Sequence, residues 1–189
     1  MNKEIIVKEN EELFLPILWT GEETNLSYTI FLTEKGAKVT LLGLFLGRES
    51  RKVDIKTTIH HQNRDTTSEV IIKGALTDTA AINYQGMVKI DPGAKGTKAW
   101  LAAHLLLLST KAKGTAIPSL EILENDIKAG HATTVGRVND MELFYLMSRG
   151  LSKETAKLLI VEGFLQSILE KFPEDIADKA RKELSSYVS

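Results

Sequence analysis

The sequence predicts a mainly β chain that ends in α-helices, and three observations predict it. Before residue 138, apolar and β-branched residues recur with a period of two, as in residues 53–60. Turn residues such as Asp91-Pro92-Gly93 separate these runs. After residue 138 the apolar period changes to about 3.6. The change predicts two parts, a β body over residues 1–138 and a helical subdomain over residues 139–189.

Strand candidates follow one another through the β body at intervals of roughly 10–15 residues. They are residues 26–32, 39–44, 53–60, 68–76, 80–90, 97–108, 117–123 and 133–138. Glycine-containing stretches such as Lys113-Gly114 are predicted to be turns. So many short strands are typical of a sandwich, a barrel or a β-solenoid, and the periodicity alone does not choose among them.

Two strand candidates are apolar on both faces, at residues 41–46 and 105–108. A sheet with one solvated face alternates apolar and polar residues, so these strands are predicted to be covered on both sides. The cover is either a second sheet, a subunit interface, or another part of the same chain.

Helix signals organise the C-terminal part. Asn139 with Glu142 resembles a capping box at the start of a first helix, and Gly150 can end that helix. Ser152 is a suitable N-cap for a second helix, with Ala156, Leu159 and Ile160 among its apolar positions. Pro173 suits the first turn of a third helix, whose apolar positions run from Ile176 to Tyr187.

Composition narrows the function classes. The net charge is −1, from 24 basic and 25 acidic residues, and argues against nucleic-acid binding. With no cysteine, the chain has no disulfide and no thiolate ligand of its own. The longest nearly apolar run is about half of what a membrane span needs, and the N-terminus lacks a signal-peptide pattern. We therefore expect a cytoplasmic protein that spans no membrane.

The four histidines are the candidate reactive residues, and none has the spacing of a standard zinc site. His60 and His61 are adjacent, so on a strand they would point to opposite faces. His131 is predicted in a glycine-flanked turn that leads into the last strand, where it could bind a metal or relay a proton. The alternative is that His131 only pins this junction through backbone hydrogen bonds. Phosphate-binding and nucleophile-elbow motifs are absent from the sequence.

Two segments closely resemble the C-terminal core of the SufB/SufD family. Residues 118–136 read PSLEILENDIKAGHATTVG, and residues 143–151 read LFYLMSRGL. The family pattern has P-x-L-E-I, then a D-V/I-x-x-x-H-x-A element, then L-F-Y-L-x-S-R-G. Upstream, His60, Gly74, Asp78 and the Tyr84-Gln-Gly86 segment also match. The resemblance covers about residues 55–170.

This resemblance implies a right-handed parallel β-helix followed by a helical subdomain, and work in iron–sulfur cluster assembly. It implies a SufC-like ATPase as partner, docked on the C-terminal helices. It also implies a homodimer, or a heterodimer with a SufB/SufD paralogue, formed by the β-helix. The residues that we place at the ATPase contact lie in the first helix and its end: Asp140, Leu143, Phe144, Tyr145, Arg149 and Gly150.

The family position that is glutamate in SufB and histidine in SufD falls on His131, so the chain resembles a short SufD-like member. SufB-type members carry a cysteine near the position of His104. We therefore expect a non-enzymatic scaffold whose His131, with His104, meets iron or a transient iron–sulfur cluster. The alternative is an interaction module that dimerises and recruits the ATPase without binding iron or cluster, which the absence of cysteine favours. A sugar-active β-solenoid would need paired acids, which the sequence does not show.

Overall fold

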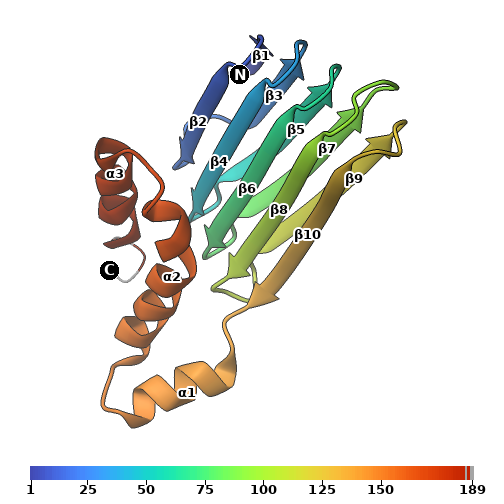
Figure 1. Ribbon diagram of the computed structural model, residues 1–189. Helices are drawn as coiled ribbons and strands as arrows, with labels where there is room; N and C mark the ends of the chain where they lie inside the picture. The colour runs from blue at the N-terminus through green and yellow to red at the C-terminus, as the bar shows by residue number, and fades with distance from the viewer. Residues whose placement is uncertain (186, 188–189) are drawn as a thin grey trace.

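The computed structural model describes residues 1–185 and 187, which form a parallel β-solenoid followed by three helices (Figure 1). The odd-numbered strands form one five-stranded sheet in the order β1-β3-β5-β7-β9, and the even-numbered strands form the other in the order β10-β8-β6-β4-β2. Every pair of neighbours in the two sheets is parallel. The expected parallel β-helix with C-terminal helices is therefore confirmed. The strands are β1 (Asn2–Val7), β2 (Glu12–Trp19), β3 (Asn25–Leu32), β4 (Lys38–Gly47), β5 (Lys52–His61), β6 (Thr67–Leu76), β7 (Ala81–Ile90), β8 (Lys98–Leu107), β9 (Lys113–Ile122) and β10 (Lys128–Arg137).

The period of two places alternate side chains inside the coil, where residues at equivalent positions stack from turn to turn. Ile30 lies beside Ile59, and Ile59 lies beside Val88, and all three are completely buried. These stacked aliphatic side chains fill their part of the interior and add no polar group that needs a partner. The register is thereby fixed, because a slip by one residue would turn every apolar side chain outward.

The turns that join the two sheets also stack, through residues with positive φ. Asn10, Gly36, Asp65 and Gly96 all have φ between 55° and 72°. The backbone N–H groups of Gly36, Asp65 and Gly96 each donate to a carbonyl of the next turn of the solenoid. Asparagine, aspartate and glycine tolerate this conformation best, so the turn residues found from the sequence serve a repeated corner.

The helical part consists of α1 (Asp140–Ser148), α2 (Lys153–Leu169) and α3 (Glu174–Ser185). Asn139 and Ser152 are N-caps, as predicted, and accept from the backbone N–H groups of Met141 and Thr155. Gly150 has a φ of 93° just after α1, which also agrees with its predicted role. Pro173 lies one residue before α3, and its carbonyl accepts from the backbone N–H groups of Ile176 and Ala177.

Helices α2 and α3 cover the outer face of the sheet of even-numbered strands (Figure 1). Leu42, Leu44 and Leu46 of β4 point outward and form a second core with Val161 and Leu165 of α2. The strand that the sequence shows to be apolar on both faces is therefore covered by this chain's own helices. The sequence left open a second sheet, a subunit interface or another part of the same chain as the cover, and for β4 the structure supports another part of the same chain.

The structure corrects two sequence predictions and adds two strands. Lys113-Gly114 begins β9 rather than forming a turn, and His131 lies within β10 rather than before the last strand. The reason is packing: a Cβ at Gly130 would lie 2.7 Å from the Trp100 ring. A glycine required by a neighbouring indole looks in the sequence like a turn signal. The N-terminal strands β1 and β2 were also not predicted.

Candidate functional site

The candidate site begins at the last turn of the solenoid, where β9 and β10 are the edge strands of the two sheets. An edge strand leaves one row of backbone N–H and C=O groups without sheet partners. Large apolar side chains are exposed on the same turn: Ile117 and Ile122 on β9, and Val135 on β10. This end therefore offers both unpaired backbone groups and apolar surface.

His131 lies in the middle of this end. It pairs in register with Leu101 of β8, which is completely buried in the interior core. Because paired residues of a parallel sheet point to the same side, the imidazole of His131 points inward. No further strand covers it in the described part of the chain, so the side chain is exposed. His131 is thus an accessible imidazole on the inner face of the last strand.

His104 has a different environment on the outer face of the same sheet. Its register neighbours are Lys73 of β6 and Thr134 of β10, and its Nδ1 lies 2.8 Å from the Thr134 hydroxyl oxygen. Burial, and then the positive charge of Lys73, lower the pKa of His104. Both effects favour the neutral imidazole, which is the form that binds metal.

The structure does not bring the two predicted histidines together. His131 pairs with Leu101, three residues before His104, which is about 10 Å along the strand. An offset of three residues also places the two side chains on opposite faces of the sheet. Within the described residues there is no group of three or more histidine, aspartate or glutamate side chains suited to hold a metal. His104 and His131 therefore do not act together on one bound ion in this arrangement.

Lys73 is a contact residue that the sequence analysis missed. Its ammonium donates to the carbonyl of Phe164 and to the Ser167 hydroxyl, 2.8 Å away, and lies 4.8 Å from the centre of the Phe164 ring. Burial lowers its pKa. Lys73 therefore connects α2 with β6. On the outer face of the sheet it is next to His104 of β8, which is next to Thr134 of β10. The available signal is a single lysine between the outward-facing Ile71 and Ala75.

The predicted partner residues lie on or directly after α1, a helix with no buried residue. Met141 and Phe144 are 74% and 67% exposed, and Tyr145 and Met147 are also exposed. A hollow of about 410 Å³ lies between α1 and α2, lined by Met141, Glu142, Tyr145, Leu146 and Ile160. So much apolar side chain on one short helix is unusual for a surface that meets only water.

The adjacent histidines of β5 point to opposite faces, as predicted. His60 points outward, and its Nε2 lies 2.8 Å from the Asp91 carboxylate. His61 is completely buried. Its Nδ1 lies 2.8 Å from the Thr66 hydroxyl oxygen, and its Nε2 lies 2.8 Å from the Ser68 hydroxyl oxygen. Burial lowers the pKa of His61 to about 3, and the nearby His60 adds to the effect. His61 is therefore a neutral structural residue near pH 7.

Comparison with known proteins agrees with this arrangement. The family described as SUF system FeS cluster assembly, SufBD core domain, matches residues 5–164. The chain belongs to the SufBD family. It is 36% identical to the iron-sulfur cluster assembly protein SufD of Bacillus subtilis over 143 residues, which are 76% of this chain and 32% of that protein. A SufBD family protein of Pyrococcus horikoshii is 31% identical over 167 residues, which are 88% of this chain and 37% of that protein.

The SufBD chain described here thus spans about a third of the length of these two relatives. The matched region contains all ten strands except the first residues of β1, as well as α1 and the first part of α2. Both the open end of the solenoid and the α1 surface therefore lie within the family core. None of the helices in the described part of the chain is long and apolar enough to cross a membrane.

Proposed function

We propose that this SufBD protein is a non-enzymatic scaffold subunit that works in the cytoplasm with a SufC-type ATPase. The supporting observation is α1, which carries four exposed large apolar side chains and belongs to the matched family region. In this proposal residues 1–138 are the rigid scaffold and residues 139–189 are the docking subdomain. Phe144 and Tyr145 are the central contacts, because aromatic side chains bury the most apolar area on binding.

The route from α1 to the solenoid is short. Helix α1 begins at Asp140, only three residues after β10 ends at Arg137. A movement of α1 that is driven by the bound ATPase would therefore act on β10, the edge strand that carries His131. We propose that β9 and β10 pair with a second copy of this chain or with a SufB/SufD paralogue, because their free edges can accept further strands.

His131 is the residue that we propose to meet the cargo, iron or a nascent iron–sulfur cluster. A neutral imidazole is a good ligand for iron, and the exposed position on the last strand leaves the ring accessible to an incoming ion. His104 lies on the other face, and we propose for it a secondary contact at the same β10 edge. With no cysteine in this chain, any thiolate ligand would come from the partner.

The docking proposal is tested with the SufC-type ATPase of the same organism. We expect Phe144→Ala to weaken binding, measured by calorimetry, by about tenfold or more, because aromatic anchors dominate interfaces. Phe14→Ala is the matched control, since Phe14 is also an exposed phenylalanine but lies on β2. Equal affinities for the two variants would refute α1 as the contact.

The second candidate function is a module that dimerises and recruits the ATPase while another subunit binds the cluster. The absence of cysteine favours this candidate. Anaerobic reconstitution of the complex with iron and sulfide distinguishes the two. If His131 meets the cargo, His131→Ala lowers the visible absorbance of the cluster, whereas His60→Ala on another face does not. Identical absorbance for His131→Ala and the unmodified complex would support the module.

A further inference from the structure

A second hollow, of about 310 Å³, lies where β10, α1 and α2 meet, and its lining has an excess of positive charge. Three cations line it, Arg137 at the end of β10 and Lys153 and Lys157 at the start of α2, against one acid, Asp140. The apolar part of the lining is Leu107, Leu108, Val138 and Leu143. The whole chain carries a net charge of −1, so the positive excess here is local.

In the part of the chain that the structure describes, these cations have no carboxylate partner at contact distance. Within residues 1–185 and 187, no ion pair closer than 4.0 Å involves Arg137, Lys153 or Lys157. Among the described residues, the Arg137 guanidinium donates only to the carbonyl of Thr110, at 3.4 Å. Lys153 and Lys157 are four residues apart on one helix, a spacing at which like charges repel each other.

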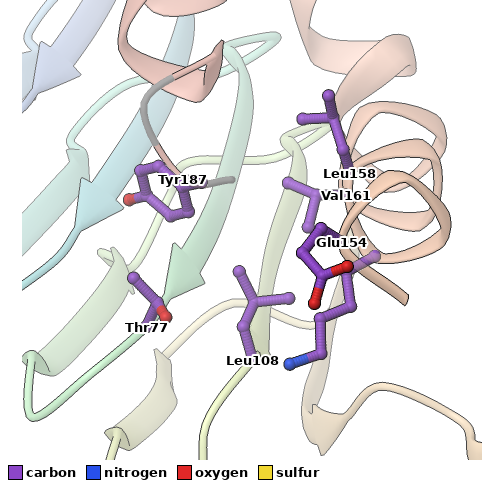
Figure 2. Close-up of a pocket in the computed structure, with 7 residues that line it drawn as sticks. Thr77, Leu108, Glu154, Leu158, Val161 and Tyr187 are labelled. Atoms are coloured by element: carbon purple, nitrogen blue, oxygen red, sulfur yellow. The ribbon is translucent and has the colours of Figure 1, made fainter. Parts of the chain in front are cut away.

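A neighbouring hollow contains the next acidic side chain along α2, Glu154. It measures about 180 Å³ and shares Leu108 and Lys157 with the larger one. Figure 2 shows Glu154 on this side, beside Leu108 and the Val161 side chain. Glu154 lines only the smaller hollow, while Asp140 is the acidic residue that lines the hollow of about 310 Å³ with Arg137 and Lys153. An incoming anion would therefore bind favourably there.

We infer that the hollow of about 310 Å³, where β10, α1 and α2 meet, receives an acidic segment of the protein that docks on α1. This inference rests on the proposed function, because it adds a charged contact to the same interface. Asp140 and Leu143 belong to α1 and also line the hollow, so a partner that covers α1 reaches its edge. The apolar lining suits the methylene part of a glutamate or aspartate side chain, and the three cations suit its carboxylate.

The test compares two double charge reversals in the full chain. Lys153→Glu with Lys157→Glu alters the hollow, and Lys52→Glu with Lys56→Glu alters two exposed lysines, also four apart, on β5. Lys153 is in the first turn of α2, where an acidic residue favours the helix, so the first variant should fold. Binding of the SufC-type ATPase is measured from low salt to about 0.5 M NaCl, where charge effects are screened.

We expect the hollow variant to bind about tenfold more weakly at low salt, with the difference shrinking at high salt. The β5 variant should bind like the unmodified chain. Equal affinities of the two variants would overturn the inference, while Phe144→Ala would still report on α1. Failure of the unmodified chain to bind would overturn both proposals.

Inorganic phosphate is a second probe, because a small anion could use the same cations. Thermal stability is measured with and without phosphate at constant ionic strength. If phosphate stabilises the unmodified chain but not the hollow variant, and both bind the ATPase equally, the hollow binds small anions and the inference of an acidic protein segment is wrong.

Discussion

His61 and His131 are both inward-facing histidines of the same solenoid, but the turn on which each lies gives them opposite properties. His61 is covered by strands on both sides, and its ring nitrogens each meet a hydroxyl group. His131 lies on the last strand of its sheet, and its side chain is exposed and has no hydrogen-bond partner among the described residues. The comparison shows that position along the solenoid, rather than residue type, separates structural histidines from accessible ones.

Helices α1 and α2 repeat this contrast. Val161, Leu165 and Ile168 of α2 are buried in the same core as the outward leucines of β4, whereas α1 has no buried residue. Both helices are rich in apolar side chains, so composition alone does not separate them. In α2 the apolar side chains stabilise the fold, and in α1 they remain available to a partner.

The largest predicted difference between the two histidines is the effect of His61 on how the free energy of unfolding depends on pH. Its pKa is about 3 in the folded chain and about 6.5 when unfolded, so between these values only the unfolded chain binds the proton. The free energy of unfolding should therefore fall as the pH drops from about 6.5 toward 3, by up to about 4–5 kcal/mol.

The measurement is denaturant unfolding of the unmodified chain and of His61→Gln at several pH values. Glutamine retains hydrogen-bonding groups but does not titrate. The variant should lose less stability on acidification, while His131→Ala should follow the unmodified chain. Parallel pH profiles for His61→Gln and the unmodified chain would mean that His61 is not the buried neutral residue described here.

The next effect compares the two helices. Leu165→Ala should lower the free energy of unfolding by about 2–5 kcal/mol, because it leaves a cavity between α2 and the solenoid. Phe144→Ala should change it by less than about 0.5 kcal/mol, as expected for an exposed side chain. Urea denaturation of both variants measures this. A comparable loss in Phe144→Ala would show that α1 is part of the folded core.

The smallest effect concerns His104 and the edge of α2. Lys73→Met keeps most of the apolar contact with Phe164 but removes the positive charge beside His104. The pKa of His104 should rise, and it should remain below that of an unfolded histidine because burial is the larger cause. Histidine NMR resonances followed through a pH titration measure the change. An unchanged pKa of His104 would show that the charge of Lys73 does not act on His104.

Much of the fold could be predicted from local sequence. The period of two predicted the strands from β3 onward, and the caps at Asn139 and Ser152 located the starts of α1 and α2. The misplaced turn at His131 has a long-range cause, since Gly130 makes room for Trp100, 30 residues away in the sequence. Such a contact has no signal in the residues next to Gly130.

The candidate site divides in the same way. The family pattern pointed to His131 and to the α1 residues, and both prove to be accessible. The cations of the hollow at the β10–α1–α2 junction come from β10 and α2 and share no motif, so no local pattern groups Arg137 with Lys153. Lys73 is likewise significant only because α2 folds back onto β6.

By itself the sequence determined the order of strands and helices, the helix caps and membership of the SufBD family, because periodicity, caps and motifs are local properties. Only the tertiary structure decided which strand faces are covered, and that His104 and His131 point to opposite sides. The physical reason is register: each strand pairs with strands about 30 residues away, and a shift of one residue would exchange the buried and exposed faces.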